Sequence, residues 1–135
     1  MLSNLHTHTT FCDGKDTPEE VVLGAIEKGF GAIGFSGHCY MPYTSYSMTL
    51  ASTVAYRQEI GRLKEKYGHL IDVFCGLEFD EYSDDDRTGY DYIIGTCHTL
   101  SPLHDGARVE VDGPVELLRE AITRDFGGDP YAAAE

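Results

Sequence analysis

The feature that most constrains the fold is an alternation of short apolar segments with longer segments of helical periodicity. The apolar segments have the length of buried strands, and they cover residues 2–6, 32–36, 71–77 and 90–96. Segments with helical spacing and helix start or stop signals cover residues 17–29, 50–67 and 113–128. Strands that alternate with helices imply βα units, so we predict an α/β fold with a parallel sheet.

Helix signals are clearest at the first helix. Thr17 is predicted to cap it, Pro18 suits the first helical position, and Glu20 completes a capping box. Apolar residues at helical spacing are predicted to face the core in all three helices: Val22 and Ile26; Tyr56, Ile60, Leu63 and Tyr67; Val115, Leu118 and Ile122.

The chain has 135 residues, which suits a single domain over residues 1–135. Closed (β/α) barrels typically need about 250 residues, so four βα units are too few to close one. The 10 Lys and Arg against 23 Asp and Glu give a formal net charge of −13. Nucleic acids and anionic membranes both attract basic surfaces, so this charge argues against either as a partner.

The sequence also favours a cytoplasmic location. No apolar run approaches the ~18 residues of a membrane span, and the first residues lack the pattern of a secretory signal. Four scattered cysteines without a CxxC pair argue against a disulfide framework and against a zinc ribbon.

Each predicted strand is followed by a residue type that binds metals. The first leads into His6 and His8, and the later strands lead into His38, Glu78 and His98. The carboxyl ends of parallel strands lie on one face, where α/β proteins build their active sites. Asp13, in the loop after the first strand, is a further candidate. We therefore predict a metal centre, and a mixed histidine and carboxylate set suits Zn, Mn or Fe.

Other chemistry-bearing residues have simpler interpretations. Cys12, Cys39 and Cys97 adjoin the candidate ligands, but strand neighbours point to opposite faces, so we favour packing roles. The acidic stretch at residues 80–86 is predicted to be a solvated loop, with a weak cation site as the alternative. His69 is expected on the surface. His104 and the arginines Arg87 and Arg108 are candidates for substrate contact, against the alternative of solvated side chains. No nucleophile elbow or phosphate-binding glycine motif is present.

Four ordered motifs resemble the PHP phosphoesterase superfamily, and within it the histidinol-phosphate phosphatases. They are HTHTTFCDGKDTPEE, AIEKGFGAIGFSGH, FCGLEFDEYSD and GYDYIIGTCHTL, beginning at His6, Ala25, Phe74 and Gly89. The resemblance implies a distorted (β/α)7 TIM-like barrel, of which this chain covers about the first four βα units. It also implies a centre of two or three divalent metals held by these matched positions: His6, His8, Asp13, His38, Glu78 and His98.

The resemblance further implies a reaction, in which metal-bound hydroxide hydrolyses L-histidinol phosphate to L-histidinol and phosphate in histidine biosynthesis. Glu78, His98 and Asp13 are the residues assigned to catalysis. The family places further ligands in the second half of its barrel, so this chain is expected to be a truncated N-terminal portion. Two alternatives stay open: another phosphoester substrate such as a nucleotide, or an inactive or assembly-dependent half-barrel that self-associates or joins a missing C-terminal half.

Overall fold

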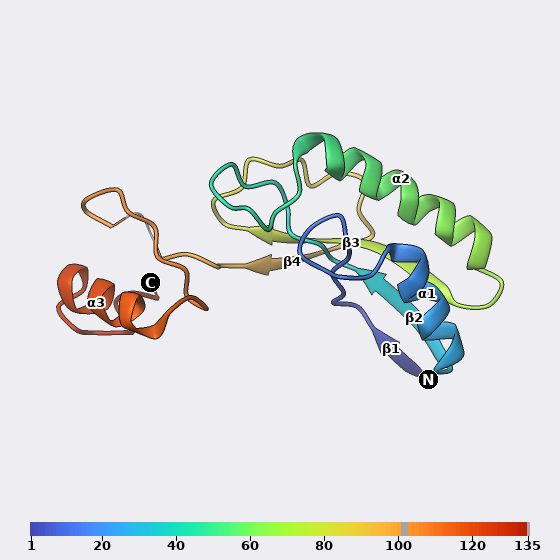
Figure 1. The fold of residues 1–135 in the computed structure, drawn as a ribbon, viewed down its shortest axis with the longest axis horizontal. Coiled ribbons are helices and arrows are strands. Elements are labelled where there is room, and N and C mark those ends of the chain that lie inside the picture. The colour runs from blue at the N-terminus through green and yellow to red at the C-terminus, as the bar shows by residue number, and fades with distance from the viewer. Residues whose placement is uncertain (101–102, 135) are drawn as a thin grey trace. The chain divides into compact units, whose positions relative to one another are not determined.

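The computed structural model describes residues 1–100 and 103–134. The chain forms two compact units, Met1–Thr96 and Cys97–Glu135, and each is considered by itself. The first unit contains a four-stranded sheet with two helices (Figure 1). None of the helices in the described part of the chain is long and apolar enough to cross a membrane.

The sheet of the first unit is parallel throughout. Its strands are β1 (Leu2–Asn4), β2 (Phe30–Phe35), β3 (Asp72–Asp80) and β4 (Tyr92–Thr96), and they lie in the order of the sequence. This confirms the predicted α/β class. β3 runs three residues past its predicted end because β4 pairs with its second half, from Gly76 to Asp80. Glu78 therefore lies inside β3 rather than after it.

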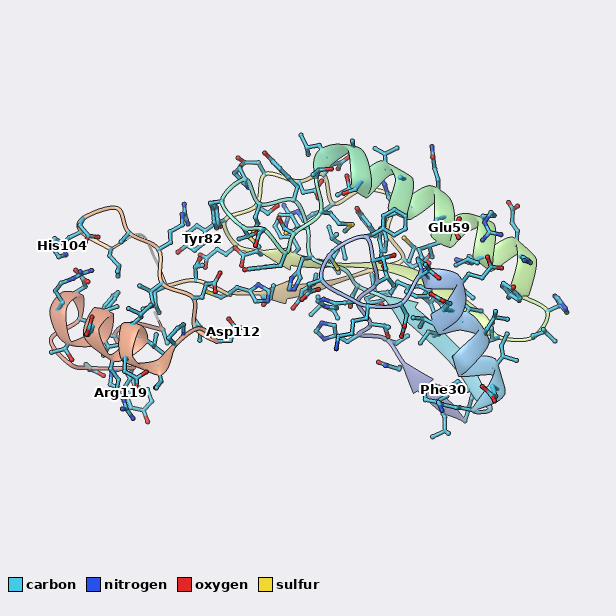
Figure 2. The ribbon with its side chains drawn as sticks, viewed as in Figure 1. Phe30, Glu59, Tyr82, His104, Asp112 and Arg119 are labelled. Atoms are coloured by element: carbon cyan, nitrogen blue, oxygen red, sulfur yellow. The ribbon has the colours of Figure 1, made fainter. Side chains whose placement is uncertain are left out.

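Helices α1 (Pro18–Glu27) and α2 (Leu50–Tyr67) connect the first three strands. The predicted capping box is present: the Thr17 hydroxyl accepts from the Glu20 amide, and the Glu20 carboxylate accepts from the Thr17 amide at 2.8 Å. The box satisfies amides that the first turn of any helix leaves without a partner. Thr49 and Ser52 form the corresponding contacts at α2. Figure 2 labels Glu59 on α2 and Phe30 at the start of β2.

One hydrophobic cluster joins both helices to the sheet. Val22 of α1 and the side chains of Tyr56, Ile60 and Leu63 of α2 are fully or almost fully buried, as their spacing predicts. They pack with strand residues such as Leu77. Because this cluster packs the helices and loops against the sheet, it fixes the positions of the carboxyl ends of the strands.

The second unit contains α3 (Val115–Asp125) and a small cluster of its own around Leu100, Leu103 and Ala121. Leu118 packs against this cluster as predicted. The prediction for Val115 is wrong: it is 47% exposed, because it lies in the first turn and the helix buries Ala121 instead. Ser101 and Pro102 lie outside the described residues.

Candidate metal centre

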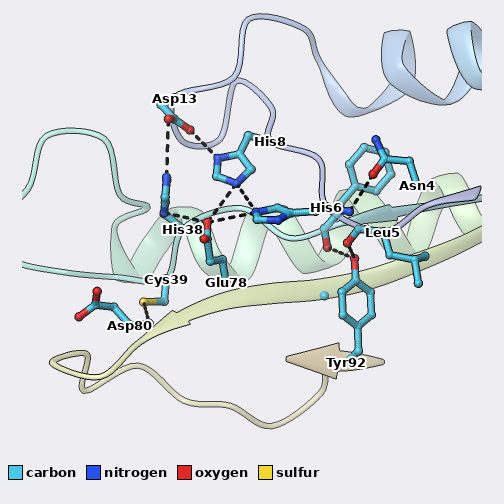
Figure 3. A network of polar contacts seen from close by, with 12 residues as sticks. Asn4, Leu5, His6, His8, Asp13, His38, Cys39, Glu78, Asp80 and Tyr92 are labelled. Atoms are coloured by element: carbon cyan, nitrogen blue, oxygen red, sulfur yellow. Dashed lines mark hydrogen bonds and ion pairs between the residues drawn. The ribbon is translucent and has the colours of Figure 1, made fainter. Parts of the chain in front are cut away.

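Five of the predicted ligands, all in the first unit, form one contact network, in which three imidazoles surround the carboxylate of Glu78 (Figure 3). Oε2 of Glu78 is 3.1 Å from His8 Nε2 and 3.1 Å from His38 Nδ1. It is 3.5 Å from His6 Nε2, which itself lies 3.2 Å from His8 Nε2. Three imidazoles from two separate segments thus converge on a carboxylate whose side chain is only 7% exposed.

Asp13 lies on the other side of the imidazoles. Its Oδ1 is 2.7 Å from His8 Nδ1, and its Oδ2 is 3.6 Å from His38 Nε2. Within the first unit, the ligand atoms therefore form two adjoining groups, His6 with His8 and Glu78, and His8 with Asp13 and His38, each within 4.8 Å. Imidazole nitrogens and carboxylate oxygens at such spacing suit a divalent cation of the Zn, Mn or Fe kind.

Local structure explains why His6, His8 and Asp13 meet. The two histidines are separated by one residue on an extended segment, so both imidazoles project to the same side. The chain then turns back: Thr9 O accepts from the amides of Cys12 and Gly14, each at 3.0 Å. A Cβ at Gly14 would lie 2.3 Å from Thr9 N, so this turn requires glycine, and it returns Asp13 to His8.

Sheet pairing beyond the regular strands positions His38 against Glu78. The two residues form a parallel bridge, in which Cys39 N donates to Glu78 O at 2.9 Å and Glu78 N donates to Gly37 O at 3.1 Å. His38 is also packed edge-on by the ring of Tyr46, with centroids 4.8 Å apart. Backbone hydrogen bonds, rather than flexible loops, thus hold this pair in place.

The charges of the cluster reinforce one another. Hydrogen bonding with Cys12 and with Glu78 raises the pKa of His8 to about 11. Burial acts to raise the pKa of Asp13, but hydrogen bonds with His8 and Cys12 outweigh it, and the pKa falls below its ordinary value. Burial likewise opposes the shift at Cys12, whose pKa is lowered by hydrogen bonds with His8 and backbone groups. The cluster therefore favours the ionised forms of Asp13 and Cys12 and the protonated form of His8.

The other predicted site residues belong to the second unit, apart from Arg87, which lies in the loop between β3 and β4. His98 follows β4 by two residues and belongs to the second unit, where its carbonyl accepts from Val111 N at 2.8 Å; its role as a ligand stays a prediction. His104 pairs with Asp125 of α3, and Arg108 is exposed in the loop before α3. Arg87 is exposed, and its guanidinium lies 4.9 Å from the centre of the Phe79 ring.

Two expectations outside the cluster need correction. The acidic stretch is not simply solvated, because Asp80 is fully buried and Asp85 accepts from Tyr40 N at 3.0 Å. Cys97 is exposed, so its packing role is wrong, whereas Cys39 and Cys75 are buried in the core. Cys39 also accepts a hydrogen bond from Asp80 N. Among the described residues the cysteines form no disulfide, and His69 is exposed as expected.

Sequence reasoning missed two contacts of the centre, Cys12 with His8 and Tyr46 with His38. Tyr46 lies in the long loop before α2, where no periodicity indicates which side chains turn inward. For Cys12, the rule that neighbouring strand residues point to opposite faces predicted a packing role away from the ligands. The rule does not apply, because residues 10–13 form a turn rather than a strand.

The first unit thus has a parallel α/β sheet with a cluster of imidazoles and carboxylates at the carboxyl ends of its strands. This arrangement is typical of α/β proteins with a metal centre. The PHP domain model matches residues 4–126, and the chain belongs to this family. No curated protein is significantly similar to the chain.

Two solved structures are similar to the chain. A candidate histidinol phosphatase, hisK, from Listeria monocytogenes is 26% identical with a TM-score of 0.79, and the match covers 97% of this chain and 57% of that one. A histidinol phosphate phosphatase from Lactococcus lactis subsp. lactis Il1403, complexed with zinc, L-histidinol and phosphate, is 26% identical with a TM-score of 0.56. That match covers 71% of this chain and 40% of the other. These matches confirm the expected partial TIM-like barrel of the PHP type.

Proposed function

We propose that the chain is part of a metal-dependent phosphoesterase whose substrate is L-histidinol phosphate, with L-histidinol and phosphate as products. The observation that carries the proposal is the convergence of His6, His8 and His38 on the buried Glu78, with Asp13 beside them. Family membership and the two similar structures support the reaction class, and the names of those structures support the substrate.

The proposed ligands are the five clustered side chains together with His98, and the proposed cofactors are two or three Zn, Mn or Fe ions. His98 is included because it follows β4, the strand beside Glu78. When bound, such ions lower the pKa of a water molecule and offset the charge of a phosphate. This local positive charge would also draw a phosphate ester to a chain whose formal net charge is −13.

The chain's own residues orient the ligand atoms. Asp13 at 2.7 Å is an acceptor, so Nδ1 of His8 carries a proton. Nε2 faces Glu78 and His6, and a cation bound there would displace the second proton, which the raised pKa of His8 favours in the cluster without metal. Two backbone hydrogen bonds hold the Glu78 backbone against the His38 segment, and its side chain is only 7% exposed. In this proposal Glu78, Asp13 and His98 serve catalysis by holding the ions, and His104 and Arg108 stay candidates for substrate contact.

Metal binding is the direct test. Metal content and Co²⁺ affinity are measured for the wild-type chain, His6→Ala, Glu78→Gln and the matched control His69→Ala, whose imidazole is exposed outside the cluster. We expect loss in the two site variants and none in the control. Equal metal content in all four proteins would contradict the proposal.

Substrate is tested by phosphate release from histidinol phosphate and from nucleoside monophosphates. Preference for histidinol phosphate supports the proposed substrate. Preference for a nucleotide would agree with the proposed phosphoesterase activity but contradict histidinol phosphate as the substrate. The expected cytoplasmic location and the absence of nucleic-acid or membrane partners stay predictions from the sequence.

A second candidate is a metal-binding half-barrel that becomes active only after assembly with another copy or with a separate second half. The open sheet favours it: within the described residues β1 pairs only with β2, and β4 only with β3. The chain also spans only 57% and 40% of the two similar structures. Light scattering with activity measurements tests it, since full turnover by a monomer would exclude this candidate.

A further inference from the structure

Tyr92 crosses the sheet from its last strand to its first. It is the first residue of β4, and its hydroxyl reaches two backbone carbonyls, Leu5 O just beyond β1 and Phe35 O at 3.1 Å at the end of β2 (Figure 3). The hydroxyl has a single proton to donate, and Leu5 O is the closer of the two acceptors. One side chain thus links β4 with the segments that lead into His6 and His38.

Two glycines make room for this path. A Cβ at Gly76 of β3 would lie 2.2–2.6 Å from three atoms of the Tyr92 ring. A Cβ at Gly34 of β2 would lie 2.5 Å from the Tyr92 hydroxyl oxygen and 2.9 Å from a Leu5 side-chain atom. The inner strands therefore lack side chains where the ring and hydroxyl cross them, and the tyrosine contacts all four strands or their extensions.

The segment that Tyr92 reaches is otherwise weakly held. β1 has three residues, all exposed, and Leu5 is 45% exposed. Beyond β1, Thr7 O accepts from Ser36 N at 3.1 Å, and the His6 amide donates to the Asn4 side chain at 3.0 Å. His6 therefore lies between two anchored carbonyls, Leu5 O and Thr7 O. The Tyr92 hydroxyl supplies one of them.

We propose that Tyr92 is a positioning residue of the metal centre, which holds the Leu5 carbonyl so that His6 and His8 face Glu78. This inference rests on the proposed metal centre and adds a residue outside the predicted ligands. Burial raises the pKa of Tyr92 to about 12, so the phenol keeps its proton and donates throughout the neutral range. Loss of this hydroxyl frees the His6 segment without touching any ligand. The ligand atoms of the cluster would then bind a cation in a less defined arrangement.

Tyr92→Phe tests the proposal because it keeps the ring over Gly76 and removes only the donor. Tyr56→Phe is the matched control, because this variant also loses a hydroxyl hydrogen bond, but one that runs to Gly76 O of β3 at 2.9 Å rather than to Leu5 O. Co²⁺ affinity and the visible spectrum of the Co²⁺ complex are measured at a temperature where circular dichroism shows each protein folded. We expect Tyr92→Phe to bind about 10–100-fold more weakly with an altered spectrum, as for other residues that orient ligands.

The outcomes separate this inference from the proposed function. A wild-type chain that binds no Co²⁺ would overturn the metal centre and the role of Tyr92 with it. A wild-type chain that binds, with Tyr92→Phe equal in affinity and spectrum, would overturn Tyr92 alone. Equal weakening in Tyr92→Phe and Tyr56→Phe would also overturn it, because general stability then explains the loss. Gly76→Ala, which keeps the hydroxyl but displaces the ring, is the second variant and should weaken Co²⁺ binding in the same direction.

Discussion

The close contact between Gly76 and Tyr92 predicts a specific loss of stability for Gly76→Ala. The new methyl group would lie 2.2–2.6 Å from the ring, whereas carbon atoms normally approach to about 3.5–4.0 Å, so the ring must move by roughly 1 Å. A shift of that size carries the hydroxyl beyond hydrogen-bonding distance of Phe35 O, now at 3.1 Å. Overpacking costs about 1–3 kcal/mol and the lost hydrogen bond about 1 kcal/mol, so we expect about 2–4 kcal/mol in all.

Urea denaturation followed by circular dichroism measures this loss, and a double-mutant cycle tests its cause. In a Tyr92→Ala background the ring is absent, so Gly76→Ala should cost much less than it does in the wild type. Two results would contradict the predicted clash between the methyl group and the Tyr92 ring. One is a Gly76→Ala protein within about 0.5 kcal/mol of wild type, the range of an ordinary surface substitution. The other is an equal cost in both backgrounds, which would show that the methyl group strains something other than the Tyr92 ring.

Three further predictions concern the scaffold. Thr17→Ala should lower the free energy of unfolding by about 1 kcal/mol, because it removes half of the capping box; urea denaturation checks this, and no change would show that the cap is dispensable. Ile60→Ala should cost about 2–5 kcal/mol in the same assay, since Ile60 is fully buried, and a cost below 1 kcal/mol would contradict its place in the core. Lys66, Tyr67 and other hydrogen-bond partners lower the pKa of Glu19 to about 2. The ionised form is thus favoured in the folded chain, so its contribution is present above about pH 4.5 and is lost as the pH falls towards 2. Glu19→Gln should flatten this part of the plot of melting temperature against pH, and an unchanged slope would rule the contribution out.

The helices and the order of the strands could be predicted from the sequence because their signals are local. Thr17, Pro18 and Glu20 cap α1 through contacts between residues three apart, and the apolar face of α2 repeats at helical spacing. The candidate ligands were predictable for a related reason, since consecutive parallel strands deliver their carboxyl ends to one edge. The end of β3 was not, because it depends on pairing with β4, which begins 12 residues after it ends.

Segment order and chain direction are enough to predict that His6, His8, His38 and Glu78 gather, with Asp13 in the loop after the first strand. The contacts that hold these side chains arise only in the folded protein, from the turn closed at Gly14 and from the path of Tyr92 over Gly76 to Leu5 O. Tyr92 and Leu5 are 87 positions apart. No periodicity or motif relates residues at such a separation, because their contact arises from packing of the whole sheet rather than from the conformation of either segment.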